Sequence, residues 1–363
     1  MSDLIKTHGL ELDRCAFCHD QCMSATPEVV ATGDQTLVVS RVANFIRLAD
    51  QGRLDWTEGL AKRLFYGLND GLQYEYCLVK KEGHRIEPFL RAARAEAVRR
   101  GLAPAAVAAA AARVRDTGNV FGCLETLPEP VAPSRGGPIL VHDAASRALT
   151  PDALAAARLL LQDVGDGPGE LAIASCGMVE FDLGYVDLSQ AAAHHVHAAL
   201  AALPEGPVVT GDPVLAYALR VMYPQWGLPL NRQVLHLSEY LVDRTDLLPT
   251  FRPRNEVATF HDPAALSRGL GIVDAPRALL ARVSGLTLVE PVSSGAAAGS
   301  DGPLAGYPDP AVASAIRHAR FNELVSTGAS LIITSSPYSK ANLEAADGGT
   351  PVFDLIEFLQ SAR

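Results

Sequence analysis

The sequence is poor in cysteine, in excess positive charge and in long apolar runs, and each shortage excludes a class of protein. Six cysteines in 363 residues are too few for the disulfide framework of a secreted protein. The formal net charge of −10 provides no basic excess for a generic nucleic-acid-binding surface. No apolar run reaches the roughly 18 residues that a membrane-spanning helix needs. Phosphate loops and nucleophile elbows are also missing.

The remaining composition is that of a globular protein with more than one domain. Hydrophobic residues make up 48% and charged residues 20% of the sequence, which excludes a disordered chain. A length of 363 residues suffices for two domains of ordinary size. The first residues, MSDLIKTHGLELDR, contain no apolar segment of the signal-peptide kind. We therefore expect a cytoplasmic protein without a membrane span, which a partner could hold at a membrane.

The chain changes character near residue 130. Before that point, apolar residues at spacings of three and four predict helices over residues 42–60, 61–68 and 89–100. Residues 128–137 are rich in proline and glycine and predict a linker. After the linker, short apolar runs alternate with helical patterns, which is typical of parallel α/β sheets.

The second part of the chain has the pattern of a tandem repeat. Strands are predicted over residues 139–142, 171–175, 208–211, 257–261, 286–290 and 331–335. Helices are predicted between them over residues 151–163, 189–202, 213–222 and 309–327. The segment VHDAA (141–145) is echoed by FHDPA (260–264), and predicted helices at 236–243 and 352–359 close the two copies. We therefore expect two α/β repeats, over residues 138–250 and 251–363.

Three of the six cysteines form a tight motif, Cys15-x2-Cys18-x3-Cys22. Cysteines at this spacing predict a metal site, because loops of two or three residues let several sulfurs face one point. The motif is similar to the first three ligands of the bacterial ferredoxin run C-x2-C-x2-C-x3-C-P, with one residue inserted. Where that run ends in Cys-Pro, this sequence has Thr26-Pro27.

A second ferredoxin-like run is degenerate and retains only its last cysteine, Cys77. Its first three ligand positions are occupied by Gly67, Asp70 and Gln73. In two-cluster ferredoxins the last cysteine of one run ligates the cluster of the other run. The lost positions, including Thr26, therefore make up the ligand set of one whole cluster.

The retained cysteines make up the other whole set. This set, the predicted ligands of a single [4Fe–4S] cluster, consists of Cys15, Cys18, Cys22 and Cys77. Four cysteines can also hold structural zinc, with His19 able to replace one of them. The alternatives to an iron–sulfur cluster are a zinc site and a site that holds no metal.

Five further segments match the landmarks of a known family. They are DTGNVFG (116–122), SCGM (175–178), HLSEYL (236–241), HDPAALSRGLGIVDAPRALL (261–280) and RFNELVSTGASLIITSSP (320–337). With the cysteine motifs, the chain resembles the iron–sulfur subunits related to heterodisulfide reductase, such as those of glycolate oxidase and anaerobic glycerol-3-phosphate dehydrogenase. In that family a two-cluster ferredoxin-like helical domain precedes two cysteine-rich repeats marked by CCG.

The resemblance implies an α+β chain with a defined domain order. A helical ferredoxin-like domain would span residues 1–127, followed by a linker over 128–137. Two CCG-type α/β repeats would then occupy residues 138–250 and 251–363.

The sequence departs from the family at the cysteines of the repeats. Ala264 stands where the family's HDPC has its cysteine, Ser293-Ser294-Gly295 replaces the second CCG, and Ser336-Pro337-Tyr338-Ser339 replaces the closing C-P-x-C. Only Cys176 remains of the first CCG. Because alanine cannot ligate iron and serine is a poor ligand, we expect neither a non-cubane cluster nor a disulfide-reducing role.

The resemblance implies a subunit that transfers electrons and has no substrate chemistry of its own. One [4Fe–4S] cluster would relay electrons between a flavin-dependent dehydrogenase partner and a quinone or carrier protein. No flavin is expected in this chain, because neither GLGIVDAP nor GDGPGE has the context of a dinucleotide fingerprint. The alternatives are a non-redox structural or assembly subunit and a small-ligand binder that uses the vacated pocket around Ala264 and Ser294.

The remaining cysteines, Asp262 and the basic residues are predicted to have mainly structural roles. Cys123 and Cys176 are expected in the core, and Asp262 is expected to cap the following helix. Four arginines provide either an anion site in the vacated pocket or ordinary surface charge: Arg268, Arg277, Arg317 and Arg320. A basic stretch either steers an acidic redox partner, tunes the potential of the cluster, or forms a solvated helix face: Lys80, Lys81, His84, Arg85, Arg91, Arg94, Arg99 and Arg100.

Overall fold

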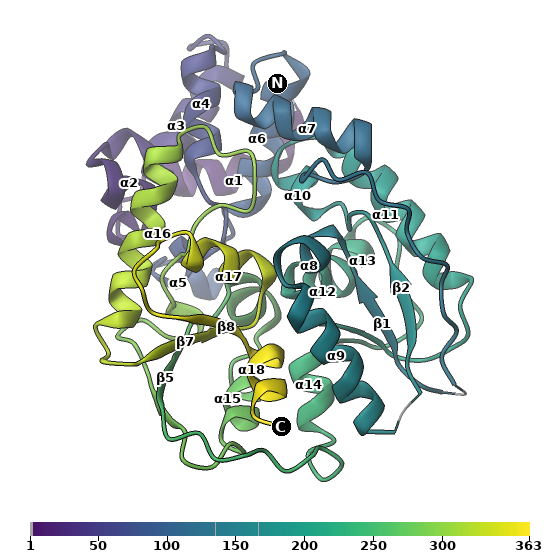
Figure 1. The fold of residues 1–363 in the computed structure, drawn as a ribbon. Helices are drawn as coiled ribbons and strands as arrows, with labels where there is room; N and C mark the ends of the chain where they lie inside the picture. The colour runs from purple at the N-terminus through teal and green to yellow at the C-terminus, as the bar shows by residue number, and fades with distance from the viewer. Residues whose placement is uncertain (1–2, 135, 166) are drawn as a thin grey trace.

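The computed structural model describes residues 3–134, 136–165 and 167–363, and Figure 1 shows the path of the chain. A helical part formed by the first third of the chain lies against two α/β parts. Each α/β part is built on a four-stranded parallel sheet. The predicted combination of helices with two parallel sheets is therefore confirmed.

The helical part is an assembly of short amphipathic helices. Its α-helices are α1 Asp3–Ala16, α2 Pro27–Thr32, α3 Val39–Asp50, α4 Glu58–Tyr66, α5 Leu72–Glu75, α6 Glu87–Arg99 and α7 Ala105–Thr117. In α3 the buried residues Val42, Ala43, Ile46 and Ala49 recur at helical spacing, so one face of the helix packs inward. Helix α1, which contains Cys15, was not predicted.

The single helix predicted over residues 42–60 is two helices, which corrects that expectation. Gly52 adopts a left-handed backbone conformation with φ of 71°, which ends α3. The hydroxyl of Thr57 then accepts the Leu60 amide at 3.2 Å and begins α4. Apolar periodicity continues across the break, so it could not reveal the turn.

The first sheet has the strand order β2-β1-β3-β4, with all strands parallel. Its strands are β1 Ile139–His142, β2 Gly169–Ala172, β3 Val208–Thr210 and β4 Val234–His236. The α-helices around it are α8 Ala144–Leu149, α9 Pro151–Asp163, α10 Met178–Asp182, α11 Val186–Ala201, α12 Pro213–Tyr217, α13 Tyr223–Gln225 and α14 Leu237–Val242. A π-helical turn, Ala218–Met222, joins α12 to α13.

The second sheet repeats this topology with the order β6-β5-β7-β8. Its strands are β5 Val257–Phe260, β6 Thr287–Val289, β7 Leu331–Thr334 and β8 Val352–Asp354. Its α-helices are α15 Asp274–Leu280, α16 Pro310–Val325, α17 Pro337–Glu344 and α18 Leu355–Ser361, and a π-helical turn spans Ala265–Gly269. The identical strand order supports the predicted duplication.

The segments predicted as closing helices begin with a strand, so that prediction was wrong at its first residues. In each repeat the strand passes into the helix without a linker: His236 ends β4 and caps α14, and Asp354 ends β8 and caps α18. A glutamate three residues later accepts the amide of the capping residue, Glu239 at 3.0 Å and Glu357 at 3.3 Å. The strands β4 and β8 were missed because three extended residues leave too little periodicity to detect.

Apolar packing joins the parts of the chain. One cluster of buried side chains runs from the N-terminal helices into the first sheet and includes Leu64, Phe89 and Val141. A second cluster joins the two sheets through α9, α14, α15 and α18, which lie between them in Figure 1. The segment predicted as a linker pairs with the edge of the first sheet, where Val131 and Glu170 exchange amide hydrogen bonds of 2.9 and 2.8 Å.

A buried guanidinium connects the helical part to the first α/β part. Arg94 on α6 donates to the carbonyl oxygens of Leu64 at 3.0 Å, of Asp182 at 2.7 Å and of Gly67. The carboxyl group of Glu28 lies nearby and is fully buried, and one of its oxygens has no partner among the described residues. Burial raises the pKa of Glu28 to about 8, although the positive charge of Arg94 opposes the rise.

We expect Gly184→Ala to destabilise the protein because the position is both conformationally special and crowded. Its φ is 82°, and a Cβ would lie 2.7 Å from the carbonyl carbon of Arg94. Gly227, with φ of 77° and no atom within 4 Å of a Cβ, is the matched control. Urea unfolding should give a loss of about 3 kcal/mol or more for Gly184→Ala and about 1 kcal/mol for Gly227→Ala. Equal losses would contradict the close contact between α6 and the first repeat.

The buried Glu28 predicts a pH-dependent stability. Its pKa is about 8 in the folded protein and near the ordinary 4.5 when unfolded, so the folded state holds the proton more tightly. Stability should therefore fall as the pH rises from about 4.5 to about 8. Glu28→Gln should remove this decline and raise the free energy of unfolding at pH 8 by roughly 2–4 kcal/mol, measured by urea titration. If the stability of this variant had the same pH dependence as that of the unmodified protein, the carboxyl group of Glu28 would not have a raised pKa in the folded state.

Candidate metal centre

The four cysteines predicted as ligands line one cavity. Cys15 lies in the last turn of α1, and the Cys18 amide donates to the Cys15 carbonyl at 3.0 Å in the turn that follows. Cys22 precedes a short 3-10 helix, and Cys77 follows α5. The cavity has about 480 Å³ of space, including its opening to solvent. The two degenerate runs therefore meet in the fold.

Burial and mutual proximity oppose ionisation of these thiols. The pKa of Cys15 is raised well above its ordinary value, first by burial and then by the neighbouring Cys22 and Cys77. Burial, with the charge of Cys18, raises the pKa of Cys22 to about 11, and burial also raises the pKa of Cys77. Without a bound cation, Cys15 and Cys22 are therefore neutral at pH 7, and thiolate ligation needs a metal that replaces their protons.

His84, named from the sequence only as part of the basic stretch, is a neighbour of the cysteines. Its Nε2 lies 3.1 Å from the Cys15 sulfur, and the ring is buried. Burial and the nearby Arg14 lower the pKa of His84, so the ring is neutral at pH 7. Hydrogen bonds to ligating sulfurs tune metal centres. The contact joins residues that are 69 positions apart, and no local signal in the sequence could have found it.

The number and chemistry of the donors fit a [4Fe–4S] cluster, which takes four cysteine thiolates. Within residues 3–134, 136–165 and 167–363, no group of three or more His, Cys, Asp or Glu side chains is arranged to hold a single metal ion. Each iron of a cubane cluster needs a single protein ligand, so its four sulfurs need not converge on one atom.

The positions of the lost second set are occupied by other interactions. The hydroxyl of Thr26 donates to the carbonyl of Cys22 at 2.8 Å, and Gln73 is buried in the wall of the cysteine cavity. Next to Gly67, the Glu28 carboxylate and the Arg94 guanidinium come within 3.7 and 3.8 Å of the place that a Cβ would take. Protein side chains therefore fill part of the space that a second set of sulfurs would face.

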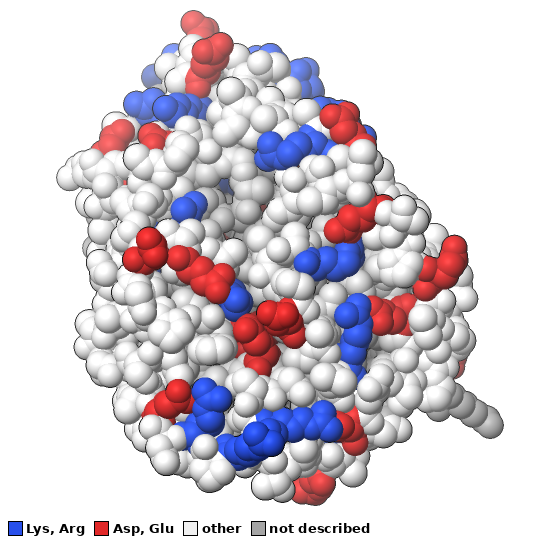
Figure 2. Space-filling view, viewed as in Figure 1, with Lys and Arg blue, Asp and Glu red and all other residues white. Residues whose placement is uncertain are grey.

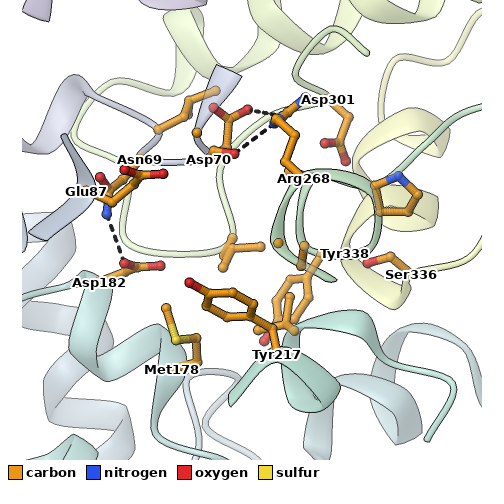
Figure 3. A pocket seen from close by; sticks show the side chains of 18 of the residues that line it. Asn69, Asp70, Glu87, Met178, Asp182, Tyr217, Arg268, Asp301, Ser336 and Tyr338 are labelled. Atoms are coloured by element: carbon orange, nitrogen blue, oxygen red, sulfur yellow. Dashed lines mark hydrogen bonds and ion pairs between the residues drawn. The ribbon is translucent and has the colours of Figure 1, made fainter. Parts of the chain in front are cut away.

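The positions of the lost repeat cysteines lie in part around a larger cavity of about 950 Å³ (Figure 3). Ala264, Ser336 and Ser339 line it. Ser294 is not among its lining residues, although the sequence suggested a pocket around both Ala264 and Ser294. Cys176 is buried, as predicted, and its carbonyl accepts the hydroxyl of Tyr223 at 3.1 Å.

Two structural predictions were wrong. Cys123 is exposed: it follows α7 in an irregular segment, where the Asn119 amide donates to its carbonyl at 2.9 Å. Asp262 does not cap a helix. Its carboxylate accepts two hydrogen bonds of 2.8 Å from Arg277 and one of 2.7 Å from the Gly295 amide. Residue type suggested both placements, but Cys123 lies in an exposed local turn held by Asn119, and the partners of Asp262 come from elsewhere in the second repeat.

Three of the four arginines considered for an anion site are paired with protein groups, whereas Nε of Arg317 is buried without a partner among the described residues. Arg268 binds Asp70 and two carbonyl oxygens, Arg277 binds two carboxylates, and Arg320 binds His261, Glu323 and a carbonyl oxygen. Within the basic stretch of residues 80–100, Arg91 and Arg94 point inward and are buried. On the face shown in Figure 2, acidic and basic side chains are interspersed.

Three curated proteins illustrate the relatives of this chain. A component of dihydromethanophenazine:CoB–CoM heterodisulfide reductase from Methanosarcina barkeri is 30% identical over 156 residues, which are 40% of this chain and 38% of that protein. A component of fumarate reductase (CoM/CoB) from Methanothermobacter marburgensis is 33% identical over 150 residues, covering 40% and 30%. A probable iron–sulfur-binding oxidoreductase, FadF of Bacillus subtilis, is 28% identical over 163 residues, covering 42% and 23%. The chain thus aligns with less than two fifths of these relatives.

The remaining comparisons concern fold and membrane association. A hypothetical protein from Helicobacter pylori, known from its crystal structure, has a similar fold, with a TM-score of 0.59 over 99% of this chain and 76% of that one, at 12% identity. No protein-family model matches the chain. In the part of the chain that the structure describes, none of the helices combines the length and apolarity needed to cross a membrane.

These three relatives come from three organisms and have different names, but all three are iron–sulfur proteins of the CCG-domain type. The resemblance predicted from the sequence motifs is thereby confirmed: over about two fifths of its length the chain is similar to CCG-domain iron–sulfur proteins related to heterodisulfide reductase.

Proposed function

We propose that this chain is an electron-transfer subunit that carries one [4Fe–4S] cluster on Cys15, Cys18, Cys22 and Cys77. The observation that carries the proposal is that these residues, from two distant parts of the sequence, line one cavity. Relatives named as components of heterodisulfide reductase and fumarate reductase and as an iron–sulfur-binding oxidoreductase support the same class of function.

The chain's own residues would hold and shield the cofactor. When bound, a cubane cluster supplies one-electron transfer. The four thiolates would ligate it, and His84, whose Nε2 lies 3.1 Å from the Cys15 sulfur, would donate a hydrogen bond to that sulfur. Ile86 and Val79 provide an apolar wall. These roles bind and tune the cofactor, and they need no acid–base residue.

The surroundings of the cavity suit contact with another protein. Phe17, 69% exposed, lies between Cys15 and Cys18 in the sequence, and Leu78, 74% exposed, follows Cys77. Large exposed apolar side chains are typical of surfaces that become covered by a partner. We propose that a flavin-dependent dehydrogenase docks here and that electrons continue to a quinone or a carrier protein.

The rest of the chain would then serve as a scaffold. We propose that residues 1–127 form the ferredoxin-like domain, with the linker at 128–137 and the CCG-type repeats at 138–250 and 251–363. The repeats would carry no non-cubane cluster, since alanine and serine stand at Ala264, Ser336 and Ser339.

Metal analysis of anaerobically purified protein tests the proposal. We expect brown protein with about four iron and four sulfide per chain and a broad absorbance near about 400 nm that dithionite bleaches. Colourless protein with one zinc per chain would contradict electron transfer and favour a structural or assembly role.

The predicted ligand set can be tested with a matched pair of cysteine variants. Cys77→Ser removes a side chain that lines the cavity, and Cys123→Ser alters an exposed cysteine outside it. The first should lower the iron content and the visible absorbance at least about fivefold, while the second leaves both unchanged. A full cluster in Cys77→Ser would disprove the proposed ligation.

The contact between His84 and Cys15 predicts a change in redox potential. His84→Ala removes a nitrogen donor to a ligating sulfur, so the reduced cluster should be less stabilised and the potential should fall by about 50 mV at unchanged iron content. His19→Ala, in the cysteine loop but outside the cavity lining, is the control. Potentiometric titration followed by electron paramagnetic resonance measures the potential of the cluster in both variants. Loss of iron in His19→Ala would instead identify His19 as a ligand.

A further inference from the structure

The larger cavity lies where the helical part and both sheets meet (Figure 3). It has about 950 Å³ of space, including its opening to solvent, and is lined from three directions. Asn69 and Glu87 come from the helical part, Tyr217 comes from the first repeat, and Ala264 and Asp301 come from the second. Among the residues that the structure describes, only Tyr74 lines both this cavity and that of the cysteines.

Its position follows from the topology of the sheets. In the first sheet the chain passes from β1 outward to β2 on one side and from β3 outward to β4 on the other side. The second sheet does the same from β5 to β6 and from β7 to β8. Ligands of open α/β sheets bind outside the carboxyl ends of the strands at such switch points. Ala264 follows β5, Ser336 follows β7 and Val214 follows β3, and all three line the cavity.

The cavity lining has an excess of negative charge. Five carboxylates and three guanidinium groups line it, and each of the carboxylates is paired with a basic side chain or a histidine. The Arg268 guanidinium is occupied, because it donates to Asp70 and to the carbonyl oxygens of Ala296 and Ala298. The side-chain oxygen of Asn69 is buried without a partner among the described residues, while its amide nitrogen donates to Asp182 at 3.1 Å. An acceptor left open in this way suits a ligand that donates hydrogen bonds.

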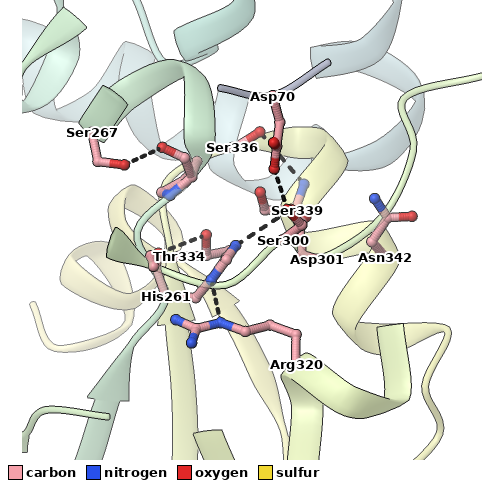
Figure 4. Close-up of polar contacts among 12 residues, drawn as sticks. Asp70, His261, Ser267, Ser300, Asp301, Arg320, Thr334, Ser336, Ser339 and Asn342 are labelled. Atoms are coloured by element: carbon pink, nitrogen blue, oxygen red, sulfur yellow. Dashed lines mark hydrogen bonds and ion pairs between the residues drawn. The ribbon is translucent and has the colours of Figure 1, made fainter. Parts of the chain in front are cut away.

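A polar network fixes one of these carboxylates on the wall (Figure 4). The Arg320 guanidinium donates to Nδ1 of His261 at 3.1 Å, so the proton of the neutral imidazole is on Nε2. Nε2 faces a carboxylate oxygen of Asp301 at 3.5 Å. Burial alone would raise the pKa of Asp301, but the interactions with His261 and Ser339 outweigh it and keep the pKa below its ordinary value. Asp301 is therefore a fixed negative charge at the cavity.

The other walls are aromatic and apolar. Tyr217, on α12, projects into the cavity in Figure 3, and Tyr338 lies close to it. Met178 and Leu304 also line the cavity. Tyrosine rings attract organic cations through their negative faces, and apolar side chains accommodate the carbon skeleton of a ligand.

We propose that this cavity binds a small organic cation, namely an amine carried on an aromatic or apolar group. The open Asn69 oxygen would receive the ammonium group, the excess of carboxylates over guanidinium groups in the lining would favour its positive charge, and the tyrosines would contact the rest of the ligand. The site is independent of the proposed iron–sulfur centre.

Two probes of similar size and opposite charge test the ligand class. 2-Phenylethylamine, protonated at pH 7, should bind saturably with one site per chain, and phenylacetate should bind at least about tenfold more weakly. Ligand-observed nuclear magnetic resonance titrations measure both. Equal or tighter binding of phenylacetate, or no saturable binding of the amine, would overturn the proposal.

Cavity variants test the location. Ala264→Trp should fill the cavity and weaken amine binding at least about tenfold, whereas Ala264→Ser should retain it. If Ala264→Trp fails to fold, Tyr217→Leu provides the second test, with an expected loss of about threefold or more. Amine binding that persists in the folded blocking variant, or in Tyr217→Leu, would overturn the assignment. Cys77→Ser should leave amine binding unchanged, so failure of the iron–sulfur proposal is distinguishable from failure of this one.

Discussion

Both candidate sites depend on the hydrogen bonds that the buried Arg94 guanidinium donates. Its hydrogen bonds to the carbonyls of Leu64 and Gly67 fix the end of α4, and its bond to the carbonyl of Asp182 fixes the end of α10. The segment that leaves α4 then supplies Asn69 and Asp70 to the larger cavity and Cys77 to the cysteine cavity. Removing the guanidinium would leave three carbonyl groups without partners in the interior, a cost of several kcal/mol.

The two repeats share a topology but use their strand ends differently. In the first repeat the residues after β1 and β3 are Asp143 and Asp212, two buried carboxyl groups that cap α8 and α12 and whose pKa values are raised by burial. In the second repeat the corresponding residues are Asp262, a buried carboxylate that binds Arg277 and the Gly295 amide, and Ser336, which caps α17 and borders the larger cavity. Both copies therefore keep buried polar groups after these strands, but in the first copy both are helix caps, whereas in the second one holds an arginine and the other borders the cavity.

The degenerate ferredoxin run has acquired structural contacts at the positions of its lost ligands. Asp70 forms an ion pair of 2.9 Å with Arg268 of the second repeat, and Gln73 lines the cavity of the retained cysteines. Thr26 is bonded to the carbonyl of Cys22, one of the predicted ligands. Of these positions, Asp70 ties the helical part to the second repeat, while Thr26 and Gln73 lie within the helical part.

The sequence by itself determined the elements whose signal is local. The run at residues 139–142 and the helical pattern at 151–163 match β1 and α9 residue for residue, because a buried strand and an amphipathic helix each impose their own period. Cysteine spacing and segment order likewise identified the family. Only the tertiary structure decided the contact of His84 with Cys15, the exposure of Cys123, and the cavity that Asn69, Tyr217 and Asp301 enclose. These depend on packing between residues distant in the chain, which leaves no periodic trace in the sequence.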